Sequence, residues 1–220
     1  MQEFPRHYFQ ALNENETSIV NHQGLHDRKP LKKKISTLRI TGGLLKGRNI
    51  TLLEKSGVRY TSSKVREAIF NVLGDLGGKK ILDLFAGSGS FTIEAISRGA
   101  LSATSVEIDR DMAKILKKNL ADFNLNNYCH VFIMDVIYAV PFLSKNAFSY
   151  DIIFMDPPYE RGYVGETMKI LTTNRIYHAD TLIVIEHSKR ETPVFSSLAG
   201  WHLVISKGYG DTVITIVQAG

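Results

Sequence analysis

Residues 79–98 read Lys79-Lys-Ile-Leu-Asp83-Leu-Phe-Ala-Gly87-Ser-Gly89-Ser-Phe-Thr-Ile-Glu-Ala-Ile-Ser-Arg98. The apolar run over Lys80–Leu84 predicts a buried strand, and Ser88–Arg98 predicts the helix that follows it. The loop Asp83–Gly89 joins the two, and its glycines allow the backbone to come close to a ligand. Ligands of open α/β sheets bind beyond the carboxyl ends of the strands. We therefore expect a binding site at this junction.

The chain that follows this junction repeats the alternation of strand and helix. Further strands are predicted over Ala103–Val106, His130–Met134, Tyr150–Met155 and Thr181–Glu186. Helices are predicted over Asp109–Asn124, Val136–Leu143 and Tyr163–Thr172. Apolar strands separated by amphipathic helices indicate an α/β fold with a mostly parallel sheet covered on both faces. Trp201–Ser206 and Thr212–Val217 predict an antiparallel hairpin that closes the sheet.

A smaller unit precedes this α/β domain. Leu38–Leu53 contains two short strands around a Gly-Gly turn, the pattern of a β-hairpin. Thr61–Leu73 has apolar residues at helical spacing, with Ser62 or Ser63 as its N-cap and Gly74 at its end. Residues 1–37 show no sustained periodicity, which indicates a flexible tail. We divide the chain into a basic tail (1–37), a hairpin–helix appendage (38–76) and the α/β domain (77–220).

Composition limits the classes of protein that the chain can belong to. It has 220 residues, of which 44% are hydrophobic and 22% charged, as in an ordinary globular domain. Its single cysteine, Cys129, excludes a disulfide framework and a cysteine-rich zinc site. No apolar run reaches the ~18 residues of a membrane span, and the start lacks the pattern of a signal peptide. We therefore expect a soluble, cytoplasmic protein.

Positive charge is concentrated in one strip of the sequence. His26–Ile50 holds eight basic residues against the single acidic Asp27, whereas the formal net charge of the whole chain is only +5. The basic residues are Arg28, Lys29, Lys32, Lys33, Lys34, Arg39, Lys46 and Arg48. Clustered Lys and Arg gain affinity for polyanions by releasing phosphate counterions. The strip indicates a nucleic-acid partner, although a solvated arm would have the same composition.

Acidic residues end two more of the predicted strands. Glu107 ends the second strand of the α/β domain and Asp135 ends the third. A carboxylate at the end of the second strand can accept hydrogen bonds from both ribose hydroxyls, so an adenosine-containing cofactor fits. The loop reads Gly87-x-Gly89-x-x-Thr92, which departs from the Gly-x-Gly-x-x-Gly pattern of dinucleotide-binding proteins. A nicotinamide cofactor is therefore less favoured.

Asp156-Pro-Pro-Tyr159 follows the apolar strand Tyr150–Met155, and its distance from Gly89 places that strand beside the first one. A double proline stops strands and stiffens loops. It also suits a reaction at a planar exocyclic amine, whose lone pair is delocalised into the ring. Asp156 can accept one N–H and the carbonyl of Pro157 the other, which orients the nitrogen lone pair toward an electrophilic methyl group. Tyr159 can stack on a base that has left its helix.

Together these motifs resemble the class I S-adenosylmethionine-dependent amino-methyltransferases, and more closely the bacterial small-subunit ribosomal RNA guanine-N2 methyltransferases of the RsmD type. The resemblance runs from about residue 38 to the C-terminus. It rests on Arg39–Arg48, Val65–Asn71, Asp83–Gly89, Glu94–Ala100, Asp156–Tyr159, Glu186–Ser188 and Tyr209–Thr212. Arg59-Tyr-Thr61 departs from the family's usual Arg-Pro-Thr, and residues 1–37 have no counterpart in it.

The resemblance implies a Rossmann-like fold with a mostly parallel seven-stranded sheet. It implies methyl transfer from S-adenosylmethionine to N2 of one guanine of 16S ribosomal RNA (guanine 966 type), within a small-subunit assembly particle and by a monomer. The implied catalytic residues are Asp156, Pro157, Pro158 and Tyr159. The implied cofactor contacts are Asp83, Phe85, Gly87, Ser88 and Gly89 near the methionine end, Glu107 and Ile108 at the ribose, Asp135 and Val136 at the adenine, and Asp156. The implied RNA contacts are Arg39, Lys46, Arg48, Arg59 and Arg66, and no metal is implied.

Three alternatives remain open. A DNA amino-methyltransferase acting on adenine N6 or cytosine N4 shares the loop Asp156–Tyr159, although the chain lacks an obvious sequence-reading domain. A non-enzymatic RNA-binding protein would explain the basic strip alone. An NAD-dependent oxidoreductase would explain the glycine loop alone.

Overall fold

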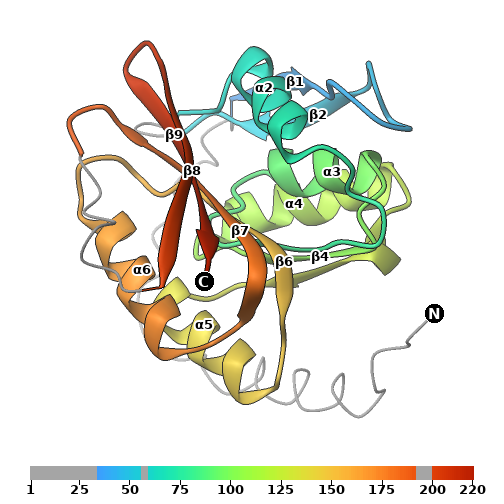
Figure 1. The fold of residues 1–220 in the computed structure, drawn as a ribbon. Helices are drawn as coiled ribbons and strands as arrows, with labels where there is room; N and C mark the ends of the chain where they lie inside the picture. The colour runs from blue at the N-terminus through green and yellow to red at the C-terminus, as the bar shows by residue number, and fades with distance from the viewer. Residues whose placement is uncertain (1–33, 56–58, 192–199) are drawn as a thin grey trace, which may run out of the picture. The chain divides into compact units, whose positions relative to one another are not determined.

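A computed structural model describes residues 34–55, 59–191 and 200–220 of the chain, in which a central sheet has the strand order β5-β4-β3-β6-β7-β9-β8 (Figure 1). The strands are β3 (Lys80–Asp83), β4 (Ser102–Val106), β5 (Cys129–Phe132), β6 (Tyr150–Met155), β7 (Tyr177–Ser188), β8 (Trp201–Tyr209) and β9 (Thr212–Ala219). β3 to β7 run parallel, and β6 lies beside β3 as its spacing predicted. β9 pairs antiparallel with β7 and β8. The predicted α/β fold with a closing hairpin is confirmed.

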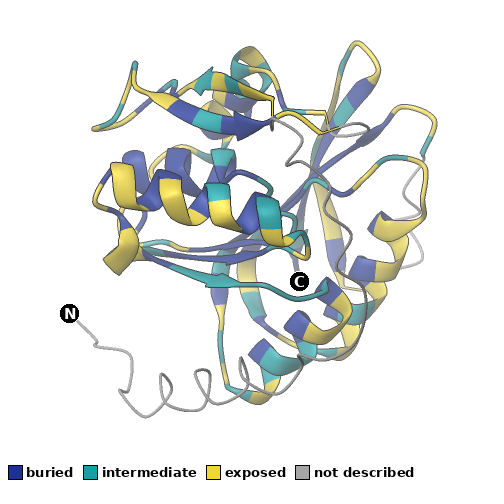
Figure 2. Cartoon of the chain, turned by 180° about the vertical axis from the view of Figure 1, so that it is seen from behind, coloured by how far each residue is buried: buried dark blue, intermediate teal, exposed yellow. Residues whose placement is uncertain are grey.

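Helices cover both faces of this sheet because its strands are apolar on both sides. α3 (Ser90–Ser97) and α4 (Arg110–Asp122) lie on one face, and α5 (Val136–Lys145) and α6 (Tyr163–Thr173) lie on the other (Figure 1). Successive residues of β6 alternate between the two cores. Ile152 and Phe154 pack on the side of α3 and α4, and Ile153 and Met155 pack on the side of α5 and α6. The helices turn their buried faces toward the sheet (Figure 2).

Each strand and helix predicted for the α/β domain is present, with bounds that differ by a few residues. The largest difference at a start is in β7, which begins at Tyr177 because Tyr150 pairs with it ahead of a register shift. Thr181 satisfies the backbone there: its hydroxyl donates to the carbonyl of Tyr150 (2.6 Å) and accepts from the N–H of His178 (2.9 Å). Within the described ranges, no helix is both long and apolar enough to cross a membrane.

The hairpin and the helix of the N-terminal appendage are also present, but residues 40–48 connect the two strands in place of the predicted tight Gly-Gly turn. β1 (Ile35–Arg39) pairs antiparallel with β2 (Asn49–Leu53). α2 (Ser63–Leu73) begins after Ser62, whose hydroxyl accepts the N–H of Val65, and ends at Gly74. Because β1 starts at residue 35, residues 35–37 belong to the hairpin and not to the predicted tail. Residues 1–33 of that tail lie outside the described residues.

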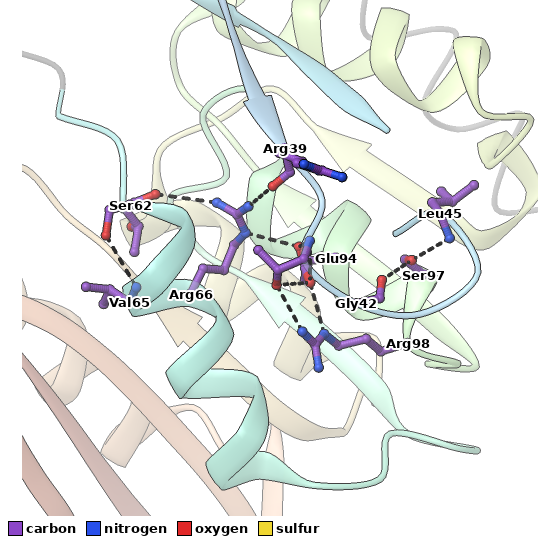
Figure 3. Close-up of polar contacts among 11 residues, drawn as sticks. Arg39, Gly42, Leu45, Ser62, Val65, Arg66, Glu94, Ser97 and Arg98 are labelled. Carbon is purple, nitrogen blue, oxygen red and sulfur yellow. Dashed lines mark hydrogen bonds and ion pairs between the residues drawn. The ribbon is translucent and has the colours of Figure 1, made fainter. Parts of the chain in front are cut away.

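Buried polar contacts attach the hairpin and α2 to α3 (Figure 3). Glu94 of α3 is fully buried and accepts hydrogen bonds from the N–H (2.9 Å) and the hydroxyl (2.6 Å) of Thr41. Its carboxylate also pairs with the guanidinium groups of Arg66 (3.2 Å) and Arg98 (3.0 Å). Arg66 in turn donates to the carbonyl oxygen of Arg39 in β1. One buried carboxylate therefore connects three elements of the fold.

Candidate active site

A cleft of about 550 Å³ opens at the carboxyl ends of the parallel strands. This volume is typical of a site for a small molecule or cofactor. The predicted residues that line it are Arg59, Phe85, Gly87, Ser88, Glu107, Ile108, Asp135, Val136, Asp156, Pro157, Pro158 and Tyr159. The fold thus brings together most of the predicted cofactor and catalytic residues, which come from the ends of four strands and from the segment before α2.

Glu107 is held in place by the glycine loop and by the start of α4. One carboxylate oxygen accepts the N–H of Gly87 (2.7 Å), and the other accepts the N–H of Asp109 (2.7 Å). Burial raises the pKa of Glu107, and these two N–H groups oppose the rise. Gly87 has φ +54°, and a Cβ added there would meet no atom within 4 Å. The loop therefore leaves open space above a fixed carboxylate, whose remaining lone pairs can accept ligand hydroxyls.

Asp83 and Gly89 are not among the described residues that line the cleft. Asp83 is buried and accepts a hydrogen bond from the Thr92 hydroxyl (2.9 Å). Burial raises the pKa of Asp83 to about 7, against the lowering effect of Thr92. Gly89 has φ +87°, and a Cβ there would come within 2.2 Å of Leu116 Cδ1. In this structure the two residues support the loop from behind, and Gly89 is required for packing against α4.

Asp83→Asn is expected to weaken the pH dependence of stability. Because the pKa of Asp83 in the folded protein lies above its ordinary value of 3.8, the folded protein holds a proton that the unfolded chain releases. The free energy of unfolding therefore falls as the pH rises from about 4 to about 7. Asparagine cannot ionise but still accepts from Thr92, so the variant loses this part of the fall. Urea unfolding across that pH range measures it, and parallel curves for both proteins would contradict the assignment.

The wall beyond Glu107 is largely apolar. Ile108 and Val136 line it, and the ring of Phe85 lies 6.3 Å from that of Tyr163. Asp135 also faces the cleft, but it is the N-cap of α5, where its side chain accepts the N–H of residue 137 (3.0 Å). One of its carboxylate oxygens is thus used by the fold, and the other has no hydrogen-bond partner within the described part of the chain, so it can accept from a ligand amine.

The loop after β6 forms the other end of the cleft. Asp156 is half-buried, Pro157 is buried and Pro158 is exposed. The hydroxyl of Tyr159 donates to Glu186 (2.9 Å) and lies 2.9 Å from the hydroxyl of Thr212. The Tyr159 ring, which was predicted to stack on a base, is therefore anchored at its hydroxyl. The guanidinium of Arg59 lies 5.5 Å from the ring centroid.

Two residues of this site, Thr61 and Glu186, were not among the predicted catalytic or cofactor-binding residues. The Thr61 hydroxyl lies 2.7 Å from Glu186 Oε2 and 3.2 Å from Asp156 Oδ2. Glu186 lies near the end of β7, and the sequence already placed it at the end of the predicted strand Thr181–Glu186 and in the family stretch Glu186–Ser188. Thr61 belongs to the segment Arg59-Tyr-Thr61. Its neighbour Tyr60 fixes the segment by a hydrogen bond to the carbonyl of Leu53.

The predicted RNA contacts lie in three different places. Arg59 is exposed and lines the cleft. Arg39, Lys46 and Arg48 are exposed at the other end of the hairpin, where the guanidinium of Arg48 lies 4.5 Å from the ring centroid of Phe123, the C-cap of α4. The N-terminal end of α4 lies at the cleft, where its N-cap Asp109 pairs with Lys55 from the segment that follows β2. A helix of this length separates the two ends by roughly 20 Å.

The structure contradicts the predicted RNA contact of Arg66. Its side chain has no exposed area, and its guanidinium is used by Glu94 and by the backbone carbonyls of Arg39 and Thr61. A phosphate cannot reach it in this fold. The stretch Val65–Asn71 is a helix whose inner face carries this arginine, and helical spacing alone did not distinguish a buried arginine from an exposed one.

The strand order, with β9 inserted antiparallel between β7 and β8, and the cleft at the carboxyl ends of the parallel strands define a class I methyltransferase fold. A solved structure of the Escherichia coli protein yhhF has a TM-score of 0.70 at 31% identity, covering 84% of this chain and 98% of that chain. The Haemophilus influenzae protein HI0767 has a TM-score of 0.72 at 28% identity, with coverages of 84% and 99%.

Sequence comparison gives the family. The family model described as "Conserved hypothetical protein 95" matches residues 38–218. "Ribosomal RNA small subunit methyltransferase D" of Escherichia coli strain K12 is 34% identical over 192 residues, which are 87% of this chain and 94% of that protein. The chain belongs to the RsmD family of methyltransferases, and the resemblance inferred from its motifs is confirmed.

Proposed function

We propose that this protein transfers a methyl group from S-adenosylmethionine to the exocyclic N2 of one guanine in 16S ribosomal RNA. The observation that carries the proposal is the half-buried Asp156, followed by the rigid Pro157, in the same cleft as Glu107. The similarity to a protein named "Ribosomal RNA small subunit methyltransferase D" supports ribosomal RNA as the substrate. The proposed substrate is a small-subunit assembly particle, and the protein acts on it as a monomer.

The residues of the cleft fit S-adenosylmethionine. Glu107 would accept the ribose hydroxyls beside the open space at Gly87. Ile108 and Val136 would contact the adenine, with the free oxygen of Asp135 toward its amine. The carboxylates of this cleft suit a cofactor with a positively charged sulfur. When bound, the cofactor supplies an electrophilic methyl group.

Asp156 and Pro157 would act on the guanine amine. The Asp156 carboxylate accepts one N–H and the Pro157 carbonyl accepts the other, so that the nitrogen lone pair is turned toward the methyl group. Their effect is positioning and preorganised charge, since both lie in a loop that two prolines make rigid. The methylated nitrogen then loses one proton, for which the Asp156 carboxylate is a hydrogen-bonded acceptor.

Glu107→Ala is expected to weaken binding of S-adenosylmethionine by about 10- to 100-fold, the range for losing hydrogen bonds to a charged group. The variant loses the ribose acceptor and leaves the N–H of Gly87 without its partner. Isothermal titration calorimetry measures the dissociation constant. Glu67→Ala, at an exposed carboxylate of α2, is the control. An unchanged dissociation constant for Glu107→Ala would count against the ribose role.

Removing the basic groups at the hairpin turn is expected to lower RNA affinity and its salt dependence. Removal of one phosphate contact reduces the slope of log affinity against log salt by roughly 0.7–0.9. The test variant carries alanine at Arg39, Lys46 and Arg48, and the matched control carries alanine at the exposed Lys145, Lys169 and Arg175. Fluorescence anisotropy with 16S ribosomal RNA fragments at several salt concentrations measures both quantities. Equal slopes for the two variants would show that the hairpin turn does not bind RNA.

The direct test uses three substrates and a methyl-labelled cofactor. Undermethylated small subunits, naked 16S ribosomal RNA and DNA are each incubated with the protein, and the labelled nucleotide is then identified. Label in N2-methylguanine of 16S ribosomal RNA is the expected result, with subunits the better substrate. Label in DNA would favour the DNA amino-methyltransferase, and RNA binding without any label would favour a non-enzymatic RNA-binding protein.

A further inference from the structure

Glu186 lies behind the amine-binding end of the cleft, and both of its carboxylate oxygens have a hydroxyl partner. It is only 6% exposed. Oε1 accepts from the Tyr159 hydroxyl (2.9 Å), and Oε2 lies 2.7 Å from the Thr61 hydroxyl. Glu186 therefore contacts Thr61, which lies just before the N-cap of α2, and Tyr159, the last residue of the loop Asp156–Tyr159. It does not line the large cleft among the described residues, so its effect on the substrate must pass through these neighbours.

The Thr61 hydroxyl lies between two carboxyl groups but has only one proton to donate. Its oxygen is 2.7 Å from Glu186 Oε2 and 3.2 Å from Asp156 Oδ2. If Thr61 donates to one carboxylate, the other can hydrogen-bond to the threonine oxygen only when it carries a proton itself. Two ionised carboxylates would leave one oxygen facing a lone pair in a buried site, which is unfavourable. The three groups are satisfied together by one additional proton.

The position of that proton follows from the difference in exposure between the two carboxyl groups. Asp156 is half-buried and opens to the water of the cleft, whereas Glu186 is buried. A negative charge is therefore more stable on Asp156. A protonated Glu186 can accept from Tyr159 at its carbonyl oxygen Oε1 and donate from Oε2 to Thr61. Thr61 then donates to the Asp156 anion, and each of these hydrogen-bonding groups has a partner.

The charged groups around Glu186, Thr61 and Asp156 are consistent with a single proton shared by the two carboxyl groups. Burial raises the pKa of both carboxyl groups, so a second negative charge at this end of the cleft is unfavourable. Asp83 of β3 adds to the rise for Asp156, and Arg59 lowers the pKa of both. Burial raises the pKa of Tyr159, so its hydroxyl keeps its proton and remains a donor.

We propose that Glu186 is a positioning residue that carries a proton at neutral pH and, through Thr61, keeps Asp156 ionised and oriented toward the target amine. The proposal rests on the proposed function, because it concerns the amine-binding end of the same cleft. Asp156 remains the group that contacts the substrate and takes the proton released from the methylated amine. Glu186 gives up no proton in the reaction.

Infrared spectroscopy of the free protein with ¹³C-labelled glutamate tests the protonation of Glu186 without any substrate. At neutral pH the carbonyl band of a protonated carboxylic acid is expected in the wild type and is expected to disappear in Glu186→Gln. Glu160→Gln is the matched control, because Arg190 holds the pKa of the exposed Glu160 low and this residue is ionised. A wild-type spectrum without the band, or a band that persists in Glu186→Gln, would overturn the proposal.

Kinetics of methyl transfer to undermethylated small subunits test the consequence for catalysis. Glutamine reproduces the protonated glutamate, so Glu186→Gln should retain a kcat at least about tenfold above that of Glu186→Leu. It should also lack the fall of kcat that the wild type shows at alkaline pH, where Glu186 ionises and Thr61 turns away from Asp156. Equal losses in both variants, or superimposable pH profiles of the wild type and Glu186→Gln, would refute the role.

Thr61 provides a second pair of variants that does not alter Glu186. Thr61→Ser keeps the hydroxyl and should retain kcat, and Thr61→Val removes it and should lower kcat about tenfold with little change in KM. Equal kcat in this pair would break the proposed connection. A wild type that methylates no RNA would defeat the proposed function, whereas the infrared band decides the state of Glu186 independently.

Discussion

Asp156→Ala is expected to lower kcat by about 10²- to 10³-fold while it changes the affinity for S-adenosylmethionine much less. Alanine removes the acceptor for one amine N–H, so the nitrogen lone pair is no longer turned toward the methyl group. It also removes the acceptor for the proton that the methylated amine releases. The contacts of Glu107 with Gly87 and Asp109 lie at the other end of the cleft and are unchanged.

Three measurements separate this effect from loss of structure. Single-turnover methyl transfer gives the chemical rate, calorimetry gives cofactor affinity, and thermal unfolding confirms that the variant folds. Glu160→Ala is the matched control, because Glu160 lies in the same loop but is exposed and pairs with Arg190. We expect Asp156→Asn to lose less than alanine, since the amide retains one acceptor oxygen. Near-normal turnover in Asp156→Ala would exclude the proposed mechanism.

The sheet could be predicted because two features of the sequence indicate its strands: an apolar run and an acidic residue at the end of that run. Tyr150–Met155 is a continuous apolar run, as expected of a strand buried on both faces, and the residue that follows it is Asp156 at the loop. The early start of β7 could not be predicted in the same way. It depends on hydrogen bonds of one threonine hydroxyl, Thr181, to backbone groups of two separate segments. Such tertiary contacts leave no period in the sequence.

The site could be predicted where function requires a residue type at a strand end, as at Glu107 and Asp156. It could not be predicted where burial decides the role. Asp83 and Gly89 match the family motif, yet one packs behind the loop and the other against Leu116. Arg66 has the charge expected of an RNA contact, and only its three-dimensional neighbours show that it is paired inside the protein. Charge in a sequence indicates a partner but not whether that partner is internal.

Arg66→Met is therefore expected to destabilise the fold by about 3–5 kcal/mol, the cost of removing one partner from a buried ion pair. Methionine keeps most of the hydrocarbon volume, so the loss comes from the guanidinium. Without it, the Glu94 carboxylate keeps Arg98 as its one cation among the described residues, and the carbonyls of Arg39 and Thr61 lose a donor. Because these carbonyls lie in β1 and in the active-site segment, the variant should loosen both.

Arg39→Met is the matched control for Arg66→Met, and the two variants should have opposite effects. The Arg39 side chain is exposed, so its loss should change stability by less than about 0.5 kcal/mol. Because Arg39 is a proposed phosphate contact, Arg39→Met should nevertheless reduce the salt dependence of RNA binding. Arg66→Met should leave this salt dependence unchanged in the folded protein. Urea unfolding and anisotropy titrations measure the two quantities. A side chain that holds the hairpin onto α3 cannot be removed without lowering the free energy of unfolding. If Arg66→Met instead weakened RNA binding at unchanged stability, Arg66 would not have the structural role proposed for it.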